Sequence, residues 1–107
     1  MSENEDDAEL FLSLVAGMQA RDSRLTPLQA ALIVAAELGI ARDSRTFARV
    51  VGVAHALALR ELNALVNMGG PLRVTKREMR TLRTHYVPRD EAAGAATDLP
   101  PPSGYEA

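Results

Sequence analysis

Apolar residues recur at helical spacing near the start of the chain, between Ala8 and about Arg21. The period predicts an amphipathic helix whose apolar stripe runs from Leu10 to Met18. This stripe must cover either the chain's own core or the same stripe of a second copy. A homodimer through the Leu10–Met18 helix is therefore one expected assembly. Residues 1–7 are polar and acidic without a period, and we expect them to be mobile.

The second predicted helix begins at its own capping sequence. Thr26 supplies a hydroxyl cap, Pro27 suits the first helical position, and Gln29 can reach back to the cap. The apolar run that follows extends to Leu38, and Gly39 ends it. Since this helix is apolar nearly all round, we expect it to be the buried centre of the domain.

Two further helices follow with the spacing of a helix-turn-helix. A short helix over 45–51, capped by Asp43 or Ser44, is broken by Gly52, and a longer helix covers 54–68. Gly52 can supply the left-handed backbone of a tight turn. Four residues earlier, the small Ala48 allows two helices to cross closely. We expect inward-facing side chains on both sides of this turn: Phe47, Ala48, Val51, Val53, Ala58, Leu62 and Leu65.

The opposite face of the 54–68 helix follows from the same period. Ala56, Arg60, Asn63 and Asn67 line the side away from the core. In the major groove, which admits one helix, arginine can form two hydrogen bonds with guanine and asparagine two with adenine. The small side chain of Ala56 would let the helix approach the bases closely. The pattern predicts a DNA-reading face.

The segment after Gly69-Gly70-Pro71 has two interpretations. β-branched residues over 72–76 and 81–87 predict a hairpin with its tip at 77–80. Thr75 and Glu78 also form a capping box, so an amphipathic helix over 76–86 is the alternative. We favour the hairpin because the β-branched residues prefer strands. Residues 89–107 are rich in Ala, Gly, Pro and Asp, which predicts a disordered tail.

Charge is distributed in three blocks that the net charge of −2 conceals. All 12 Lys and Arg residues lie within 21–89 against five acidic residues, which leaves +7 there. Residues 1–20 carry five acidic residues and residues 90–107 carry four. A basic centre between acidic ends favours a polyanionic partner for the centre.

Several function classes have no support in the sequence. There is no cysteine, and His55 and His85 are the only histidines, so we expect neither a disulfide nor a metal site. No phosphate-binding glycine loop, secretion signal or membrane-spanning run occurs. Asp22 and Asp43 suit local caps better than a catalytic pair. We expect a cytoplasmic protein without cofactor or enzymatic activity.

Residues 25–88 resemble winged helix-turn-helix transcriptional regulators of the MarR type. The resemblance rests on the Leu25-Thr-Pro-Leu-Gln helix start, the Ser44–Val53 helix and turn, Arg60-Glu-Leu-Asn-Ala-Leu65, Met68-Gly69 and the basic hairpin. It implies a recognition helix at 54–68, a wing at 72–87 and a homodimer on a palindromic site. This chain departs from the pattern at Ala54, where a capping side chain is usual, and in its tail, which lacks long C-terminal dimerisation helices.

The expected fold is mainly α with a small β hairpin: a winged helix-turn-helix domain over 8–88, preceded by an N-terminal amphipathic helix. The expected function is sequence-specific binding of duplex DNA in transcription regulation. The alternative is a protein-interaction module on the same scaffold that regulates another DNA-binding protein or the transcription machinery. The candidate DNA-contacting residues are Arg45, Arg49, His55, Ala56, Leu59, Arg60, Asn63, Arg73, Lys76, Arg77, Arg80 and Arg83.

Overall fold

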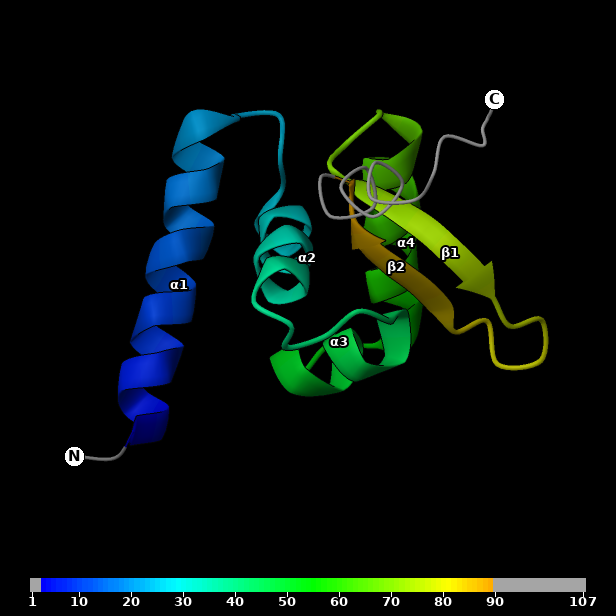
Figure 1. Ribbon diagram of the computed structural model, residues 1–107, viewed down its shortest axis with the longest axis horizontal. Coiled ribbons are helices and arrows are strands. Elements are labelled where there is room, and N and C mark those ends of the chain that lie inside the picture. The colour runs from blue at the N-terminus through cyan, green and yellow to red at the C-terminus, as the bar shows by residue number, and fades with distance from the viewer. Residues whose placement is uncertain (1–2, 90–107) are drawn as a thin grey trace, which may run out of the picture.

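The computed structural model describes residues 3–89, and the side chains from residue 7 onward. Four helices precede a two-stranded antiparallel sheet (Figure 1). They are α1 (Glu3–Arg21), α2 (Pro27–Glu37), α3 (Ser44–Val51) and α4 (His55–Asn67), followed by β1 (Leu72–Arg77) and β2 (Thr84–Pro88). The predicted fold class, mainly α with a small β hairpin, is confirmed. The tail predicted for 89–107 lies outside the described residues from residue 90 onward.

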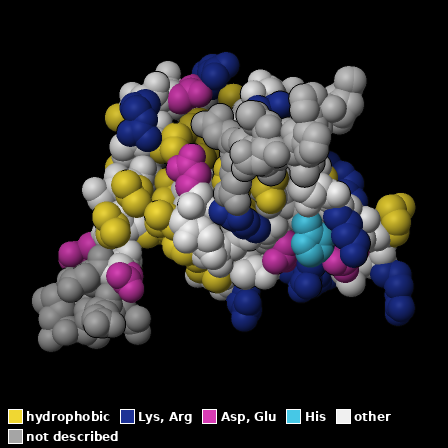
Figure 2. All heavy atoms as spheres, viewed as in Figure 1, with side chains coloured by type: hydrophobic (Ala, Val, Ile, Leu, Met, Phe, Trp, Pro, Cys, Tyr) yellow, Lys and Arg dark blue, Asp and Glu magenta, His cyan; other side chains and the backbone are white. Residues whose placement is uncertain are grey.

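Helix α1 begins at Glu3, earlier than the predicted start at Ala8. The expected irregular segment 1–7 is therefore helical from Glu3 on, because acidic residues near a helix N-terminus interact favourably with its dipole. Helix α1 packs against α2 through Val15, which is buried. Figure 2 shows that hydrophobic side chains remain on the surface along α1. None of the helices described is long and apolar enough to cross a membrane.

Helix α2 begins at the predicted capping box. The Thr26 hydroxyl accepts a hydrogen bond from the Gln29 backbone N–H at 3.1 Å, and the Thr26 N–H donates to the Gln29 side chain at 3.1 Å. Every residue from Gln29 to Ala36 is buried, so α2 is the centre of the domain as expected. Leu38 follows the last helical residue, Glu37.

The helix-turn-helix forms as the sequence predicts. The Asp43 carboxylate caps α3 by accepting hydrogen bonds from the backbone N–H groups of Arg45 and Thr46, at 3.1 and 3.0 Å. Gly52 ends α3 at φ 77°, a left-handed conformation that costs a residue with a Cβ about 1 kcal/mol or more. Helix α4 starts at His55, and the preceding N-cap residue, Ala54, supplies no side-chain hydrogen bond. The Asp43 cap and the left-handed Gly52 thus define where α3 begins and ends before the chain enters α4.

The segment after α4 is a hairpin, and the helical alternative for 76–86 is wrong. Strand β2 turns alternate residues inward, with Thr84, Tyr86 and Pro88 buried. The Glu78 side chain, which the alternative uses in a helix cap, instead meets His85, with Oε2 2.7 Å from Nε2. The tip is longer than predicted, because residues 78–83 lie between the strands.

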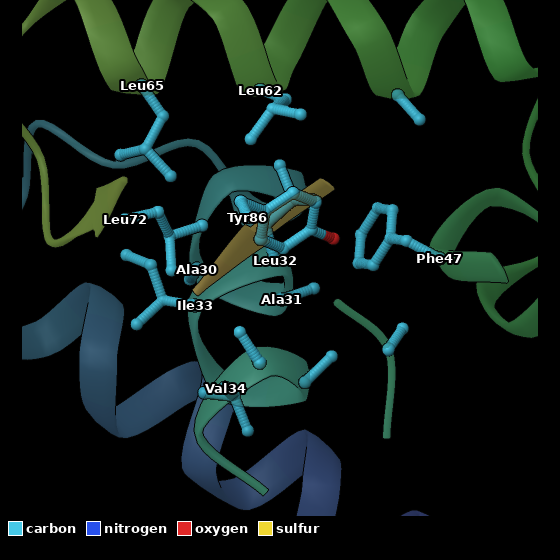
Figure 3. Close-up of a cluster of buried hydrophobic side chains, with 14 of the residues drawn as sticks. Ala30, Ala31, Leu32, Ile33, Val34, Phe47, Leu62, Leu65, Leu72 and Tyr86 are labelled. Carbon is cyan, nitrogen blue, oxygen red and sulfur yellow. The ribbon is translucent and has the colours of Figure 1, made fainter. Parts of the chain in front are cut away.

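The core contains side chains from α2, α3, α4 and both strands (Figure 3). Helix α2 lies in the middle, α4 points leucines at it from one side, and residues of α3 and the sheet close the remaining sides. The largest fully buried apolar side chains come from each of these elements: Leu32, Ile33, Phe47, Leu62, Leu65, Leu72 and Tyr86. This packing fixes α3, α4 and the hairpin as one body.

Candidate nucleic-acid interface

The outer face of α4 is set by the residues it buries. Ala58, Leu62 and Leu65 are fully buried against the core, so residues half a turn away face outward. The Arg60 side chain is 73% exposed, and its Nη2 lies 3.7 Å from Glu61 Oε2. Glu61 in turn accepts a hydrogen bond from the Thr26 hydroxyl at 2.8 Å. Arg60 is thus directed outward beside a glutamate that the α2 cap holds in place.

The rest of the predicted face is also accessible. Ala56 and Asn67 are exposed and Asn63 is half-buried. Asn63 is covered by the hairpin, because Arg77 Nη1 donates a hydrogen bond to its amide oxygen at 3.2 Å. The side chain of Asn63 therefore already has one partner inside the fold, which the spacing along α4 alone does not reveal.

The hairpin, called the wing from here on, lies beside α4. Arg77 joins the two elements, since its Nη1 donates to Asn63 and also lies 3.4 Å from the Thr84 hydroxyl. A hollow of about 180 Å³ remains between α4 and the wing tip, and Leu59 forms part of its α4 wall. Its other lining residues are Asn63, Arg77, Glu78, Met79, Leu82 and Thr84. Helix α4 and the wing together form one continuous surface.

Three of the candidate cations also make contacts within the fold that join the wing to α3 and α4. Arg45 donates from Nη2 to the backbone carbonyl of Thr81 at 3.2 Å. Arg83 Nε lies 3.2 Å from the Asp43 carboxylate, which also caps α3. Arg77 is bonded to α4 as described above. These three stay candidate DNA-contacting residues, each with a partner inside the fold that the sequence did not indicate.

The remaining candidate cations are exposed. Arg49 lies on α3, Arg60 on α4, and Arg73, Lys76 and Arg80 on the wing. Figure 2 shows Lys and Arg side chains over the wing and along the lower edge of the molecule, beneath α3. Arg73 pairs with Val87 near the base of the wing, away from the tip that carries Arg80. The surface is basic at several separate points.

His55 has an internal partner that the sequence did not indicate. Its Nε2 lies 2.7 Å from the hydroxyl of Ser44, a residue with no exposed surface. The Thr84 N–H donates to the same hydroxyl at 2.9 Å, so the Ser44 hydroxyl joins α4 to β2. His55 therefore links the first turn of α4 to α3 and, through Ser44, to β2, and its predicted contact with DNA stays a prediction.

The segment before α3 holds β2 of the wing, at and beside His85. Asp43 forms an isolated antiparallel bridge with His85, and the Tyr86 N–H donates to the Arg42 carbonyl at 3.0 Å. The buried residues Ser44 and Thr84 add the side-chain bond just described. Sequence reasoning missed both of them, since a lone Ser and a lone Thr carry no local signal of burial. The wing therefore cannot move independently of α3.

The linkage through His55 makes stability depend on pH. Burial, followed by the nearby charges of Arg45 and Arg83, lowers the pKa of His55 below its ordinary value of about 6.5, and Asp43 opposes this only in part. Between the two pKa values the unfolded chain binds the proton and the folded chain does not. The free energy of unfolding should therefore decrease as the pH falls below about 6.5.

Urea unfolding at about pH 7.5 and about pH 5.5 measures this dependence. We expect His55→Gln to lose less stability over that interval than the unaltered protein does. Both proteins keep His85, so the difference isolates His55. Equal losses in the two proteins would refute the role assigned to His55 here.

Comparison of the chain with protein-family models, with curated proteins and with solved structures found no match. The fold class accordingly rests on the helices, the turn and the wing described above. The resemblance to MarR-type regulators stays a prediction from the sequence.

Proposed function

We propose that the protein binds duplex DNA and regulates transcription, with α4 in the major groove and the wing on the backbone or in the minor groove. The observation that carries this proposal is the outward Arg60 on α4, flanked on the same surface by the wing. A guanidinium on a groove-sized helix can form two hydrogen bonds with guanine. Asn63 and Asn67, on the same face, suit adenine.

The dimensions of α4 fit this use. Its 13 residues span roughly 20 Å, and a single helix of ordinary diameter fills the major groove. The small side chain of Ala56, near the N-terminus of α4, would let the helix backbone come close to the bases. The bracing of the wing by Arg45, Arg77 and Arg83 favours binding without a large rearrangement, which keeps the entropic cost of association low.

Exposed cations would supply the sequence-independent part of the affinity. Arg49 lies on the helix before the turn, which in this geometry lies next to the phosphate backbone. Arg73, Lys76 and Arg80 extend the positive charge along the wing. Helix α1, which carries Asp7 and Glu9, lies on the other side of α2 from α4 (Figure 1), so these two acidic residues do not oppose this charge at short range.

Exposed apolar side chains on the same surface favour a second function, the binding of a protein partner. Met79 at the wing tip is 85% exposed and Leu82 is 58% exposed, while Leu57 and Leu59 of α4 are half-buried. Such side chains suit docking of a protein partner in the transcription machinery. Salt separates the two functions, because apolar docking responds weakly to ionic strength whereas phosphate contacts respond steeply.

Fluorescence anisotropy with a random duplex of about 25 base pairs tests the proposal. If about five phosphates are neutralised, the logarithm of the association constant should fall with a slope of roughly −4 to −5 against the logarithm of salt concentration. Affinity should thus drop a few hundred-fold between about 50 and about 200 mM salt. Absence of binding at the lower concentration, or an affinity unchanged by salt, would favour the protein-interaction function instead.

A further inference from the structure

Helix α1 packs against α2, yet apolar side chains on one of its flanks stay exposed. Leu10 is 56% exposed and Leu14 38% exposed, and Met18, which is half-buried against the core, continues the same line one turn further along. Leu14, Met18 and Arg21 form one wall of a hollow of about 140 Å³, and α2 forms the other with Val34, Leu38 and the charged Glu37. We call Leu10, Leu14 and Met18 the α1 stripe. Contiguous exposed apolar surface of this kind marks an interaction site.

Opposite charges border the two ends of the α1 stripe. Asp7 precedes Leu10 by three positions and Arg21 follows Met18 by three, which keeps both on the same flank of the helix. Both side chains are exposed, and Arg21 Nη2 lies 4.0 Å from the Met18 sulfur, over the end of the stripe. In Figure 2 the acidic side chains lie toward the lower end of α1 and basic ones toward its upper end.

The order of these five residues is symmetric about Leu14. From Asp7 to Arg21 the steps are three, four, four and three residues, and they read the same in both directions. Two antiparallel copies of such a helix, related by a two-fold axis at Leu14, place each residue opposite its counterpart. Acidic residues then face basic ones at both ends, and apolar residues face apolar ones between them.

We propose that the α1 stripe binds a second copy of this chain, with the two α1 helices antiparallel. Leu14 meets Leu14 at the axis, and Leu10 of each copy enters the hollow that Met18 and Leu38 of its partner line. Asp7 pairs with Arg21 twice. Such an isologous contact closes on itself and stops at a dimer.

This pairing is compatible with the proposed DNA surface and does not depend on it. Helix α1 lies on one side of α2, and α4 and the wing lie on the other (Figure 1). A second copy on α1 therefore leaves Arg60 and the wing uncovered. Measurements of mass in the absence of DNA keep failure of this inference distinct from failure of DNA binding.

Analytical ultracentrifugation of the whole protein tests the surface, read against the chain mass of 11.5 kDa. The unaltered protein should sediment at twice this mass, and Leu10→Arg should raise the dimer dissociation constant at least about tenfold. Leu12→Arg is the matched control. Leu12 is more exposed, at 65%, but lies on nearly the opposite flank, where it lines an apolar hollow of about 410 Å³ with Ile40 and Val50, and Asp7 reaches the edge of the same hollow. Circular dichroism verifies that both variants fold.

A charge swap tests the antiparallel register. Asp7→Arg and Arg21→Asp should each weaken self-association, because like charges then meet at both ends of the stripe. Mixing the two variants should restore association as a heterodimer, since each opposed pair is again one acid and one base. Native mass spectrometry separates the mixed species from the two homodimers by mass.

Three outcomes would overturn the inference. The first is a monomer at all concentrations tested, which would leave the α1 stripe to a different protein. The second is loss of the dimer in Leu12→Arg but not in Leu10→Arg, which would place the contact on the other flank. The third is a mixture of the charge variants that associates no better than each variant alone.

Discussion

Replacement of Arg60 by alanine should weaken binding to a preferred duplex by about 1–3 kcal/mol and should relax the preference for one base pair. The side chain is exposed on the outer face of α4, and its ion pair with Glu61 is long, at 3.7 Å, and open to solvent on the arginine side. A guanine can therefore compete for the guanidinium. Anisotropy titrations with the preferred duplex and with single-base variants of it measure both effects.

Two further variants make this result specific. Arg80→Ala removes an exposed wing cation, and we expect it to weaken binding on all sequences alike and to reduce the salt slope by about one. Arg24→Ala removes a charge that is bonded to Asp22 at 3.0 Å in the α1–α2 connection, so it should leave DNA affinity nearly unchanged. Equal affinities of all three variants and the unaltered protein would contradict the assignment of α4 to the groove.

Elements with a local signal were predictable from the sequence. The Thr26 and Gln29 capping box, the Asp43 cap and the left-handed Gly52 each act within four residues of their position, and all three occur as expected. The period of buried residues in α4 likewise orients Arg60 correctly, because the helix geometry converts sequence spacing into direction. The start of α1 was missed, since acidic residues before Ala8 extend a helix without adding to its apolar period.

The hairpin illustrates a conflict between local signals. Thr75 and Glu78 fit a helix cap, and the nearby β-branched residues fit strands. Contacts distant in sequence decide between them: Thr84 donates its N–H to Ser44, 40 positions earlier, and Tyr86 bonds to the Arg42 carbonyl. Only the folded chain brings these groups together. For this reason the sequence favours one outcome without fixing it.

The composition of the candidate surface was predicted, but the role of each residue was not. Residue type and spacing placed Arg77 and Arg83 on the wing correctly. Their partners, Asn63 and Asp43, come from other elements, so no pattern within the hairpin identifies them. An arginine whose partner lies 14 or 40 positions away looks the same in sequence as one that faces a phosphate.

Phe47→Ala should have the largest effect on stability, lowering the free energy of unfolding by about 3–5 kcal/mol. Phe47 has no exposed surface and extends from α3 into the core, beside Tyr86 of β2 (Figure 3). Its removal leaves a cavity that the neighbouring elements can fill only in part. For a domain whose total stability is on the order of 5–15 kcal/mol, this loss is a large fraction of the whole.

Val50→Ala on the same helix is the control for that variant. Val50 is 52% exposed, so its truncation should change stability by less than about 1 kcal/mol. Urea unfolding followed by circular dichroism measures both, and equal losses would mean that α3 does not dock through Phe47. Because α3 also carries the caps and bonds that position α4 and the wing, Phe47→Ala should reduce DNA affinity in proportion to the fraction of protein that is unfolded. A loss of affinity beyond that fraction would show that Phe47 also sets the angle between α3 and α4 in the folded protein.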